Sequence, residues 1–196
     1  ALKEAAGFEF RQKAAYERIP WRDLDTPRWL GELAAGKTLL VLAEQGLGDH
    51  FQFVRFLPQV AARVGRLVVE APPPLCDMIA RIPGVDAVID RAAPVPDHDL
   101  QVPIMSLAGV LGLNREGDLW QGPYLTAVPD RAAAWQGTVG RGDGNLHVGL
   151  IWAGNPHHPR DRERSVPANQ LAPLLAVPGV TFHSLQVGPA ASEIAA

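Results

Sequence analysis

Short apolar runs alternate along the chain with stretches of helical periodicity, and this alternation sets the expected fold. Residues 37–43, KTLLVLA, form a nearly continuous apolar run, which is typical of a strand buried on both faces of a sheet. Apolar residues then recur at helical spacing, at Phe53, Leu57, Val60 and Val64. This spacing predicts a helix with Pro58 near its first turns and its end at Gly65.

The same alternation continues to the end of the sequence. Further strands are expected at 66–71, 85–90, 98–107 (running into a small helix), 146–154 and 180–186, and helices at 2–18, 72–84 and 169–179. This order predicts the α/β class, a parallel sheet covered by helices in a Rossmann-like fold. The alternation restarts at Leu146. We therefore expect a Rossmann-like domain over 21–130, a linker over 131–145, and the beginning of a second, incomplete Rossmann-like domain over 146–196.

The composition fits a globular protein with a core, since 47% of the 196 residues are apolar and 20% are charged. The net charge of −3 argues against a dedicated nucleic-acid-binding protein, because nothing offsets phosphate repulsion. Cys76 is the single cysteine, which excludes an intrachain disulfide and favours a reducing compartment, so we expect a cytoplasmic protein. No run is long and apolar enough to span a bilayer, and the charged N-terminus is not that of a signal peptide. The chain lacks an initial Met, so we expect a piece of a longer protein.

Residues 44–49, Glu-Gln-Gly-Leu-Gly-Asp, lie between the first expected strand and the first expected helix. Doubly wound sheets bind ligands at this end of their strands. Glycines there allow positive φ angles and a close approach of the ligand, and a helix N-terminus favours an anion. Two roles are open for Asp49: the N-cap of the helix, or a carboxylate that faces a cleft and acts as a general base.

Dinucleotide binding is the rival function for this turn. Its fingerprint needs a third glycine, which falls at position 51, and that residue is Phe51. Asp49 would also repel a pyrophosphate. Glu70, at the end of the second expected strand, does stand where the ribose-binding acid of such folds is expected. We rank this function second.

Several motifs resemble one protein family. The segment AEQGLGDHFQFVRFLP at 43–58 resembles the AEQGLGD-x-x-QF-x-R signature of the glycosyltransferase-like domain that follows tetratricopeptide repeats in many bacterial proteins. That domain is similar to the heptosyltransferases of glycosyltransferase family 9, and more distantly to O-linked N-acetylglucosamine transferases. Supporting matches follow in order: PLCDMIARIPGV, DLQVPIMSLAGVLG, GPYL, VGLIWAGNPHHPRDRERSVP and FHSLQVGP. The resemblance covers residues 8–190, and residues 1–20 resemble the helix that ends such a repeat array.

The resemblance implies a GT-B fold, in which two Rossmann-like domains face each other across a cleft. It implies an inverting, metal-independent transfer of a sugar from a nucleotide-sugar donor to an acceptor hydroxyl of a saccharide, lipid or protein. The acceptor would bind mainly to the first domain and the donor mainly to the second. No cofactor is implied, since the nucleotide sugar is a substrate. The chain would hold the acceptor half and the start of the donor half, and we expect this fragment alone to be inactive.

The resemblance also implies roles for individual residues. Asp49 matches the general base of heptosyltransferases. Gln45, Gly46, Gly48, Gln52 and Arg55 match positions that bind the acceptor or stabilise the loop. Arg164 best matches a lysine that contacts the donor phosphates, and Arg162 and Asn155 lie in the same loop.

A different class of function stays open beside the enzyme. The domain is then a degenerate transferase that serves the repeat array as a binding or scaffolding module. The charged run RDRER at 160–164 is, without the family context, more often a solvated loop than an anion site. The adjacent pair His157-His158 does not indicate a metal, because no cysteine or carboxylate stands at ligand spacing.

Overall fold

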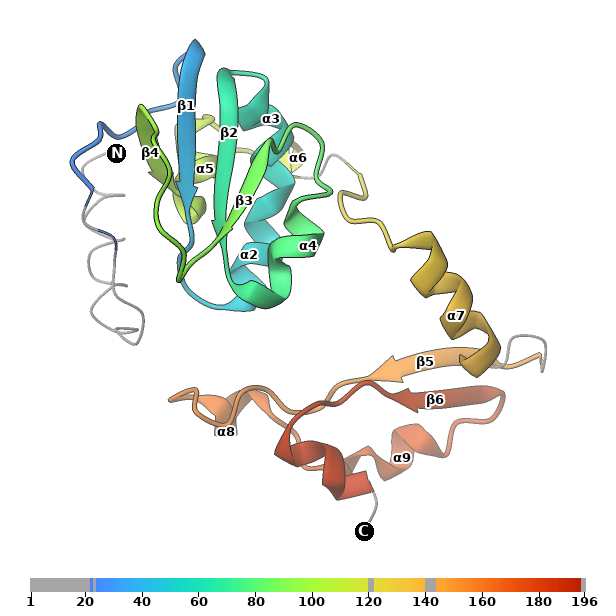
Figure 1. Ribbon diagram of the computed structural model, residues 1–196. Helices are drawn as coiled ribbons and strands as arrows, with labels where there is room; N and C mark the ends of the chain where they lie inside the picture. The colour runs from blue at the N-terminus through green and yellow to red at the C-terminus, as the bar shows by residue number, and fades with distance from the viewer. Residues whose placement is uncertain (1–21, 23, 120–121, 140–143, 195–196) are drawn as a thin grey trace. The chain divides into compact units, whose positions relative to one another are not determined.

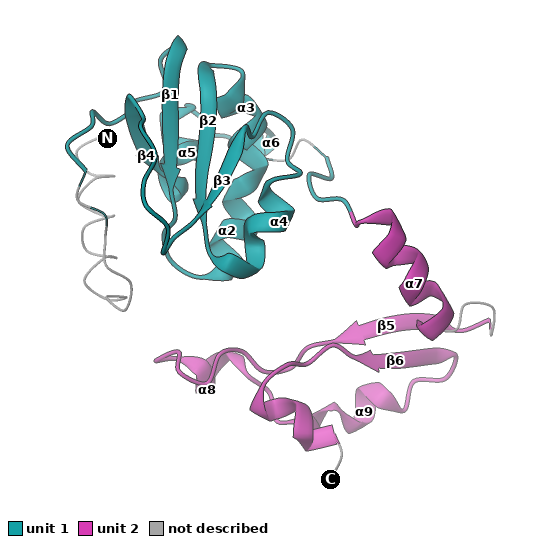
Figure 2. Cartoon of the chain, viewed as in Figure 1, with its two compact units in different colours: residues 1–126 teal, residues 127–196 magenta. Residues whose placement is uncertain are grey.

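The structure is a computed structural model that describes residues 22, 24–119, 122–139 and 144–194 (Figure 1). The chain divides into two compact units, residues 1–126 and residues 127–196 (Figure 2). The expected helix at 2–18, and with it the prediction that residues 1–20 end a repeat array, lie outside the described residues. Within the described part, no helix has the length and apolar character needed to cross a membrane.

The first unit is built on a four-stranded parallel sheet with the strand order β3-β2-β1-β4. The strands are β1 (Ala34–Leu42), β2 (Val64–Ala71), β3 (Ala87–Asp90) and β4 (Leu100–Pro103). In register, Leu40 of β1 lies between Val68 of β2 and Gln101 of β4. This sheet confirms the predicted α/β class with a Rossmann-like parallel sheet.

Helical segments connect the strands. They are α2 (Leu47–Phe53), η1 (Val54–Phe56) and α3 (Leu57–Ala61) before β2; η2 (Pro73–Leu75) and α4 (Cys76–Ile79) before β3; and η3 (Ile104–Ser106), α5 (Leu107–Val110) and α6 (Glu116–Leu119) after β4. Figure 1 shows α2, α3 and α5 on one side of the sheet. Pro58 is the second residue of α3, directly after the 3₁₀ turn η1, where its missing N–H breaks no helical hydrogen bond.

The main core lies between this helical layer and the sheet. It contains Trp29, Leu39, Val41, Val54, Leu57, Leu67, Val69, Ile79, Val102, Ile104 and Leu107, all with no exposed surface. Because successive strand residues point to opposite faces, Leu40, Leu42 and Val68 form a smaller cluster on the other face. Truncating one such buried leucine to alanine typically costs about 2–5 kcal/mol.

The predicted end of the first helix at Gly65 is wrong. The helical segment ends at Ala61, and Val64 already belongs to β2, where it lies in register with Ala34. Gly65 instead allows a close approach of two strands, since a Cβ there would overlap the carbonyl oxygen of Ala35. The physical reason for this glycine is therefore strand packing rather than the end of a helix.

The second unit begins with α7 (Pro129–Val139), which occupies part of the expected linker. A two-stranded parallel sheet follows, made of β5 (Leu146–Leu150) and β6 (Val180–Ser184). Between them lie α8 (Asp161–Arg164), η4 (Ala168–Leu171) and α9 (Ala172–Leu175), and η5 (Pro189–Ile194) comes after β6.

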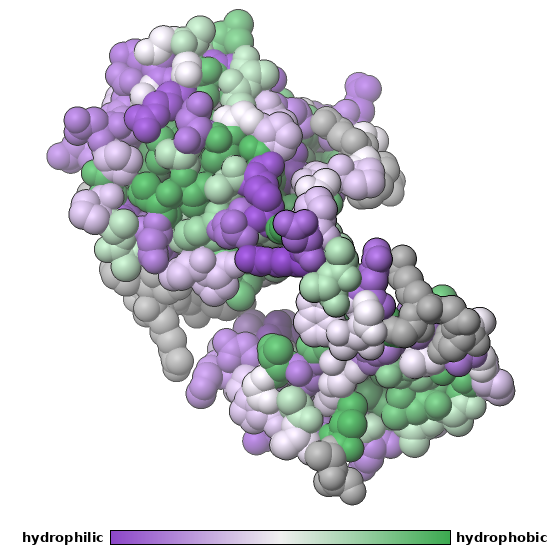
Figure 3. All heavy atoms as spheres, turned by 45° about the vertical axis from the view of Figure 1, so that its right-hand side comes forward, coloured by the Kyte–Doolittle hydropathy of each residue, from purple (hydrophilic) through white to green (hydrophobic). Residues whose placement is uncertain are grey.

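The strand expected at 146–154 is shorter than predicted, and none of the residues of β5 is buried. Leu146 is 65% exposed and Ile151 is 68% exposed, and β6 is the only strand paired with β5 among the described residues. Figure 3 shows apolar surface on this unit, coloured green. A parallel strand with one neighbour leaves its side chains uncovered, so an apolar run alone does not establish burial.

Candidate functional site

The candidate site of the first unit follows from the strand order. The chain passes from β1 outward to β2 and β3, and then returns to place β4 on the other side of β1. Ligands of open parallel sheets bind where the order reverses, at the carboxyl ends of the two strands concerned. Here those ends lead into the β1–α2 loop, residues 43–46, and into η3.

Two buried carboxylates fix the β1–α2 loop. Oε2 of Glu44 accepts the backbone N–H of Met105 in η3 at 3.1 Å, which joins the carboxyl ends of β1 and β4. Oε2 of Glu70 accepts the backbone N–H of Ala43 at 3.1 Å. Glu44 and Glu70 are both buried, and the charge of Glu70 is balanced by Arg22, whose Nε donates to Oε1 at 2.6 Å. The loop is therefore anchored on both of its neighbouring strands.

The loop has an unusual backbone, but its glycines do not cause it. Gln45 has φ = +56°, in the left-handed region that non-glycine residues rarely adopt. Gly46 has φ = −91°, and Gly48 lies inside α2 without a positive φ, so neither glycine uses the freedom to adopt a positive φ. A Cβ at Gly48 would meet no heavy atom within 4 Å. The two glycines therefore leave two positions of the turn without side chains, and neither is needed for a backbone conformation that only glycine adopts easily.

Asp49 is the third residue of α2 and Gly46 is the N-cap, so the N-cap role, one of the two left open for Asp49, is wrong. Oδ2 of Asp49 accepts the Gly46 N–H at 2.9 Å, which is the reciprocal half of a capping box. The side chain is half-buried, and Oδ1 accepts no hydrogen bond from the described residues. One oxygen of the carboxylate thus holds the loop, while the other has no hydrogen-bond partner in the described part of the chain.

His50 is a further residue of this site that the sequence analysis did not identify. It is fully buried, and its Nδ1 lies 3.0 Å from the carbonyl oxygen of Gly46. A carbonyl oxygen accepts only, so Nδ1 carries the proton. Desolvation by burial lowers the pKa of His50, while the Gly46 carbonyl and the nearby Asp49 raise it by less. The signal in the sequence was a polar residue four positions after Gly46, at helical spacing.

Arg55 and Gln52 lie farther along the same helical segment. The Gln52 side chain is exposed, and its backbone carbonyl accepts from Arg55 Nε at 2.8 Å. The Arg55 guanidinium also donates to the carbonyl of Leu119 at 3.3 Å and to the hydroxyl of Tyr124 at 3.0 Å. Arg55 therefore holds the segment around Tyr124, and these partners are outside the β1–α2 loop.

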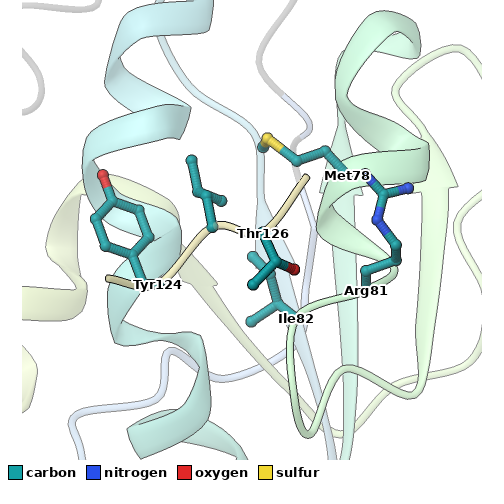
Figure 4. A pocket seen from close by; sticks show the side chains of 6 residues that line it. Met78, Arg81, Ile82, Tyr124 and Thr126 are labelled. Carbon is teal, nitrogen blue, oxygen red and sulfur yellow. The ribbon is translucent and has the colours of Figure 1, made fainter. Parts of the chain in front are cut away.

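Two hollows lie beside this segment. One has a volume of about 320 Å³ and is lined by Arg55, Gln59, Arg81 and Tyr124 together with apolar side chains. A much smaller one lies next to it and is lined by Met78, Arg81, Ile82, Tyr124, Leu125 and Thr126 (Figure 4). Neither is lined by a residue of the β1–α2 loop. They lie on the helical layer rather than at the strand ends, so we place the candidate site at the loop.

The second unit carries its own loop at the carboxyl end of β5, residues 151–165. Its base is closed by the Val166 N–H, which donates to the carbonyl of Trp152 at 2.8 Å. The Ser165 hydroxyl accepts the Gly154 N–H at 2.9 Å and donates to Oδ1 of Asp161 at 2.9 Å. The loop is therefore a compact structure with an internal polar brace.

Gln186 supports this loop from the end of β6 and was also missed from the sequence. Its Oε1 accepts the N–H groups of Trp152 at 3.0 Å and Ala153 at 2.9 Å. Its Nε2 donates to the carbonyls of Ala153 and Val187, at 3.0 and 2.8 Å. A buried amide that pairs all of these groups locks the ends of β5 and β6 together.

The three residues predicted to contact the donor phosphates all lie in this loop. Nε of Arg164 lies 3.3 Å from Oδ1 of Asp161, and a Cβ at Gly154 would lie 2.5 Å from Nη2 of Arg164. Oδ1 of Asn155 accepts the His157 N–H at 3.0 Å. Arg162 is exposed and has no side-chain partner among the described residues. Of the three, Arg162 is the most available to a ligand.

No group of three or more His, Cys, Asp or Glu side chains in the described part of the chain is arranged to hold a metal ion. The predicted site residues thus fall into two groups, one at the β1–α2 loop of the first unit and one in the loop at 151–165 of the second.

Comparison with known proteins finds a distant similarity to a longer protein. The chain is 28% identical over 206 residues to Protein FlbA of Caulobacter vibrioides, an alignment that covers 96% of this chain and 35% of that protein. The chain therefore spans about a third of the length of this curated relative. No protein-family model and no solved structure matches the chain.

Proposed function

We propose that the chain is part of a GT-B glycosyltransferase that transfers a sugar, with inversion, from a nucleotide-sugar donor to an acceptor hydroxyl. The observation that carries the proposal is the half-buried carboxylate of Asp49, which has one oxygen fixed on Gly46 N–H and the other without a partner among the described residues. It stands at the strand ends where the order of the parallel sheet reverses, the usual position for ligands.

In this mechanism Oδ1 of Asp49 accepts the proton of the acceptor hydroxyl. The hydroxyl oxygen attacks the anomeric carbon, and the bond from that carbon to the diphosphate oxygen breaks on the opposite face, so the configuration inverts. The leaving diphosphate needs positive charge, and Arg162 and Arg164 supply guanidinium groups that suit phosphate oxygens. No metal ion is required for this charge balance.

Two other functions are weaker. The first is a non-catalytic binding module attached to tetratricopeptide repeats. The capping contact of Asp49 supports it, because that contact stabilises the loop and needs no catalytic role. Dinucleotide binding is disfavoured, because both oxygens of Glu70 already bind protein groups, Arg22 and the Ala43 N–H. A ribose hydroxyl would have to displace one of them.

The test uses the full-length protein with a panel of nucleotide sugars, and measures release of the nucleoside diphosphate. Asp49→Asn keeps an oxygen acceptor for Gly46 N–H but cannot take a proton, so we expect a loss of at least about 10²-fold in turnover with folding retained. Asp97→Asn, at an exposed carboxylate in the same unit, is the matched control and should be neutral. If Asp49→Asn leaves turnover within threefold of the parent and changes only the stability, Asp49 is structural and the binding module is the better proposal.

A further inference from the structure

Both backbone polar groups of Gly46, its N–H and its carbonyl, form hydrogen bonds with neighbouring side chains. Its N–H donates to Oδ2 of Asp49 at 2.9 Å, and its carbonyl accepts from Nδ1 of His50 at 3.0 Å. The backbone N–H of His50 also points to this carbonyl, but at 3.4 Å. The side chain of His50 is therefore the closer donor to the carbonyl of Gly46, the N-cap residue of α2.

These two hydrogen bonds stabilise a loop whose backbone conformation is unfavourable. Gln45, the residue before Gly46, has φ = +56°, a conformation that costs roughly 1–2 kcal/mol for an L-residue. The hold by Asp49 depends on its charge, since an ionised carboxylate is a much better acceptor than a protonated one. A loop held by Asp49 alone would therefore relax when Asp49 takes up a proton.

The hold by His50 does not depend on that charge. Nδ1 bears a proton in both the neutral form that donates to Gly46 and the imidazolium form. His50 is fully buried and its Nε2 has no partner in the described residues, so the ring is enclosed by protein. The charged groups that act on it are Asp49, Arg91 and Glu70.

We infer that His50 is a positioning residue, which keeps the β1–α2 loop in shape by holding the Gly46 carbonyl while Asp49 exchanges its proton. The inference rests on the proposed function, in which Asp49 is the general base. It predicts that the loop of the normal protein is insensitive to the loss of the Asp49 charge. It also predicts that the loop becomes sensitive once the donor at Nδ1 is removed.

Two substitutions of His50 by an amide side chain test whether the position of the donor nitrogen matters, since both keep a polar side chain. In His50→Asn the side-chain nitrogen takes the place of Nδ1, and the donor to Gly46 is kept. In His50→Gln the nitrogen takes the place of Nε2, and the donor is lost while the amide chemistry is unchanged. Each is combined with Asp49→Asn in the full chain, and amide hydrogen exchange at positions 46 and 50 is followed by NMR.

The donor to the Gly46 carbonyl is kept in the unsubstituted protein and in His50→Asn. In these two backgrounds we expect Asp49→Asn to change the exchange rates by less than threefold. In His50→Gln the same change should accelerate exchange at least tenfold. Equal rates for the two His50 variants overturn the inference. The measurement needs no substrate, so absence of sugar transfer in the full-length protein would overturn the proposed function and leave this result standing.

Kinetics of the full-length protein add a second readout. His50→Gln should lower kcat at least tenfold with KM unchanged, and His50→Asn should restore kcat to within threefold of the parent. A loss of kcat in both variants that tracks their loss of stability would show that His50 acts only in the core, and would overturn the inference. Thermal unfolding of each variant identifies that outcome.

Discussion

The guanidinium carbon of Arg55 lies 4.5 Å from the centroid of the Tyr124 ring, and Nη2 of Arg55 donates to the Tyr124 hydroxyl at 3.0 Å. That hydroxyl in turn donates to the carbonyl of Phe51 at 2.8 Å. Arg55 belongs to the AEQGLGDHFQFVR motif and Tyr124 to the GPYL motif. Two motifs that are far apart in the sequence therefore meet in the structure, and their contact holds residues 122–126 against the helical layer.

This contact predicts a measurable contribution to stability. Tyr124→Phe removes the hydroxyl but keeps the ring, so we expect a loss of about 1 kcal/mol in the free energy of unfolding. Arg55→Ala removes the hydrogen bonds and the cation–π contact, and should cost about 2–3 kcal/mol. Urea unfolding checks both. Arg66→Ala, at an exposed arginine of β2, is the control, and an equal loss in the control would contradict the assignment.

A second prediction concerns the ion pair between the partly exposed Arg22 and the buried Glu70. Arg22→Met removes the ion-pair partner of the buried Glu70 carboxylate, whose charge then keeps only its electrostatic interaction with Arg91 among the described cations. We expect a loss near the lower end of the about 3–5 kcal/mol that breaking a fully buried pair costs. The double variant Arg22→Met/Glu70→Gln should be more stable than Arg22→Met alone, because the buried charge is gone while an oxygen still accepts the Ala43 N–H. Denaturant unfolding of the single and double variants measures the difference.

The matched control for that prediction is the exposed pair of Arg81 and Asp77. Exposed ion pairs contribute about 0–1 kcal/mol, so Arg81→Met should change stability by no more than that. If Arg22→Met were as mild as Arg81→Met, the pair of Arg22 and Glu70 would have no special role at the strand ends.

A third prediction is a pH dependence that arises from His50. Burial lowers the pKa of His50 below its ordinary value of 6.5, so the unfolded chain binds a proton more readily than the folded one. Stability from this group is therefore complete above pH 6.5 and falls as the pH drops below it, by at most about 1.4 kcal/mol per pH unit. His50→Asn should flatten the stability curve between about pH 7 and pH 5. His157→Asn, at an exposed histidine, should leave the slope as it is.

The fold was predictable from the sequence because its signals are local. The apolar run at 37–43 and the turns around it determined β1, and the alternation of strands and helices determined the parallel sheet. The residues that order the site were not predictable in the same way. Glu44 and Gln186 act through backbone groups that lie near them only after folding, so their roles depend on strand order. The partner of His50 is local in the sequence, but its burial depends on the folded core.

The glycines show the same limit. The sequence pattern predicts a helix stop at Gly65 and allows positive φ angles at Gly46 and Gly48. The structure gives Gly65 a packing reason and gives the positive φ to Gln45. A glycine in a sequence can have three different structural reasons. A neighbouring backbone can leave no room for a Cβ, the residue can need a positive φ angle, or the surface can simply carry no side chain there.

A fourth prediction tests the packing reason for Gly65. Gly65→Ala would bring a Cβ against the carbonyl of Ala35, and the starts of β1 and β2 would have to separate. We expect a loss of about 1–3 kcal/mol, as for other overpacked positions. Gly36→Ala is the control, because a Cβ there meets nothing within 4 Å. Thermal unfolding of the two variants distinguishes packing from strand propensity, and a loss shared by both variants would contradict the packing reason.

The last prediction separates stability from function at the β1–α2 loop. Gly48 lies in α2, its φ is not positive, and a Cβ there meets no heavy atom within 4 Å. Gly48→Ala should therefore stabilise the protein by about 0.4–1 kcal/mol, since it restricts the unfolded chain. If the bare turn admits an acceptor beside Asp49, the same variant should lower kcat/KM for sugar transfer at least tenfold in the full-length protein. Gly117→Ala, at a glycine of α6 where a Cβ also meets nothing within 4 Å, should leave transfer unchanged. A stabilised Gly48→Ala protein with full activity would show that no ligand approaches this turn, because a methyl group at this position would then obstruct nothing.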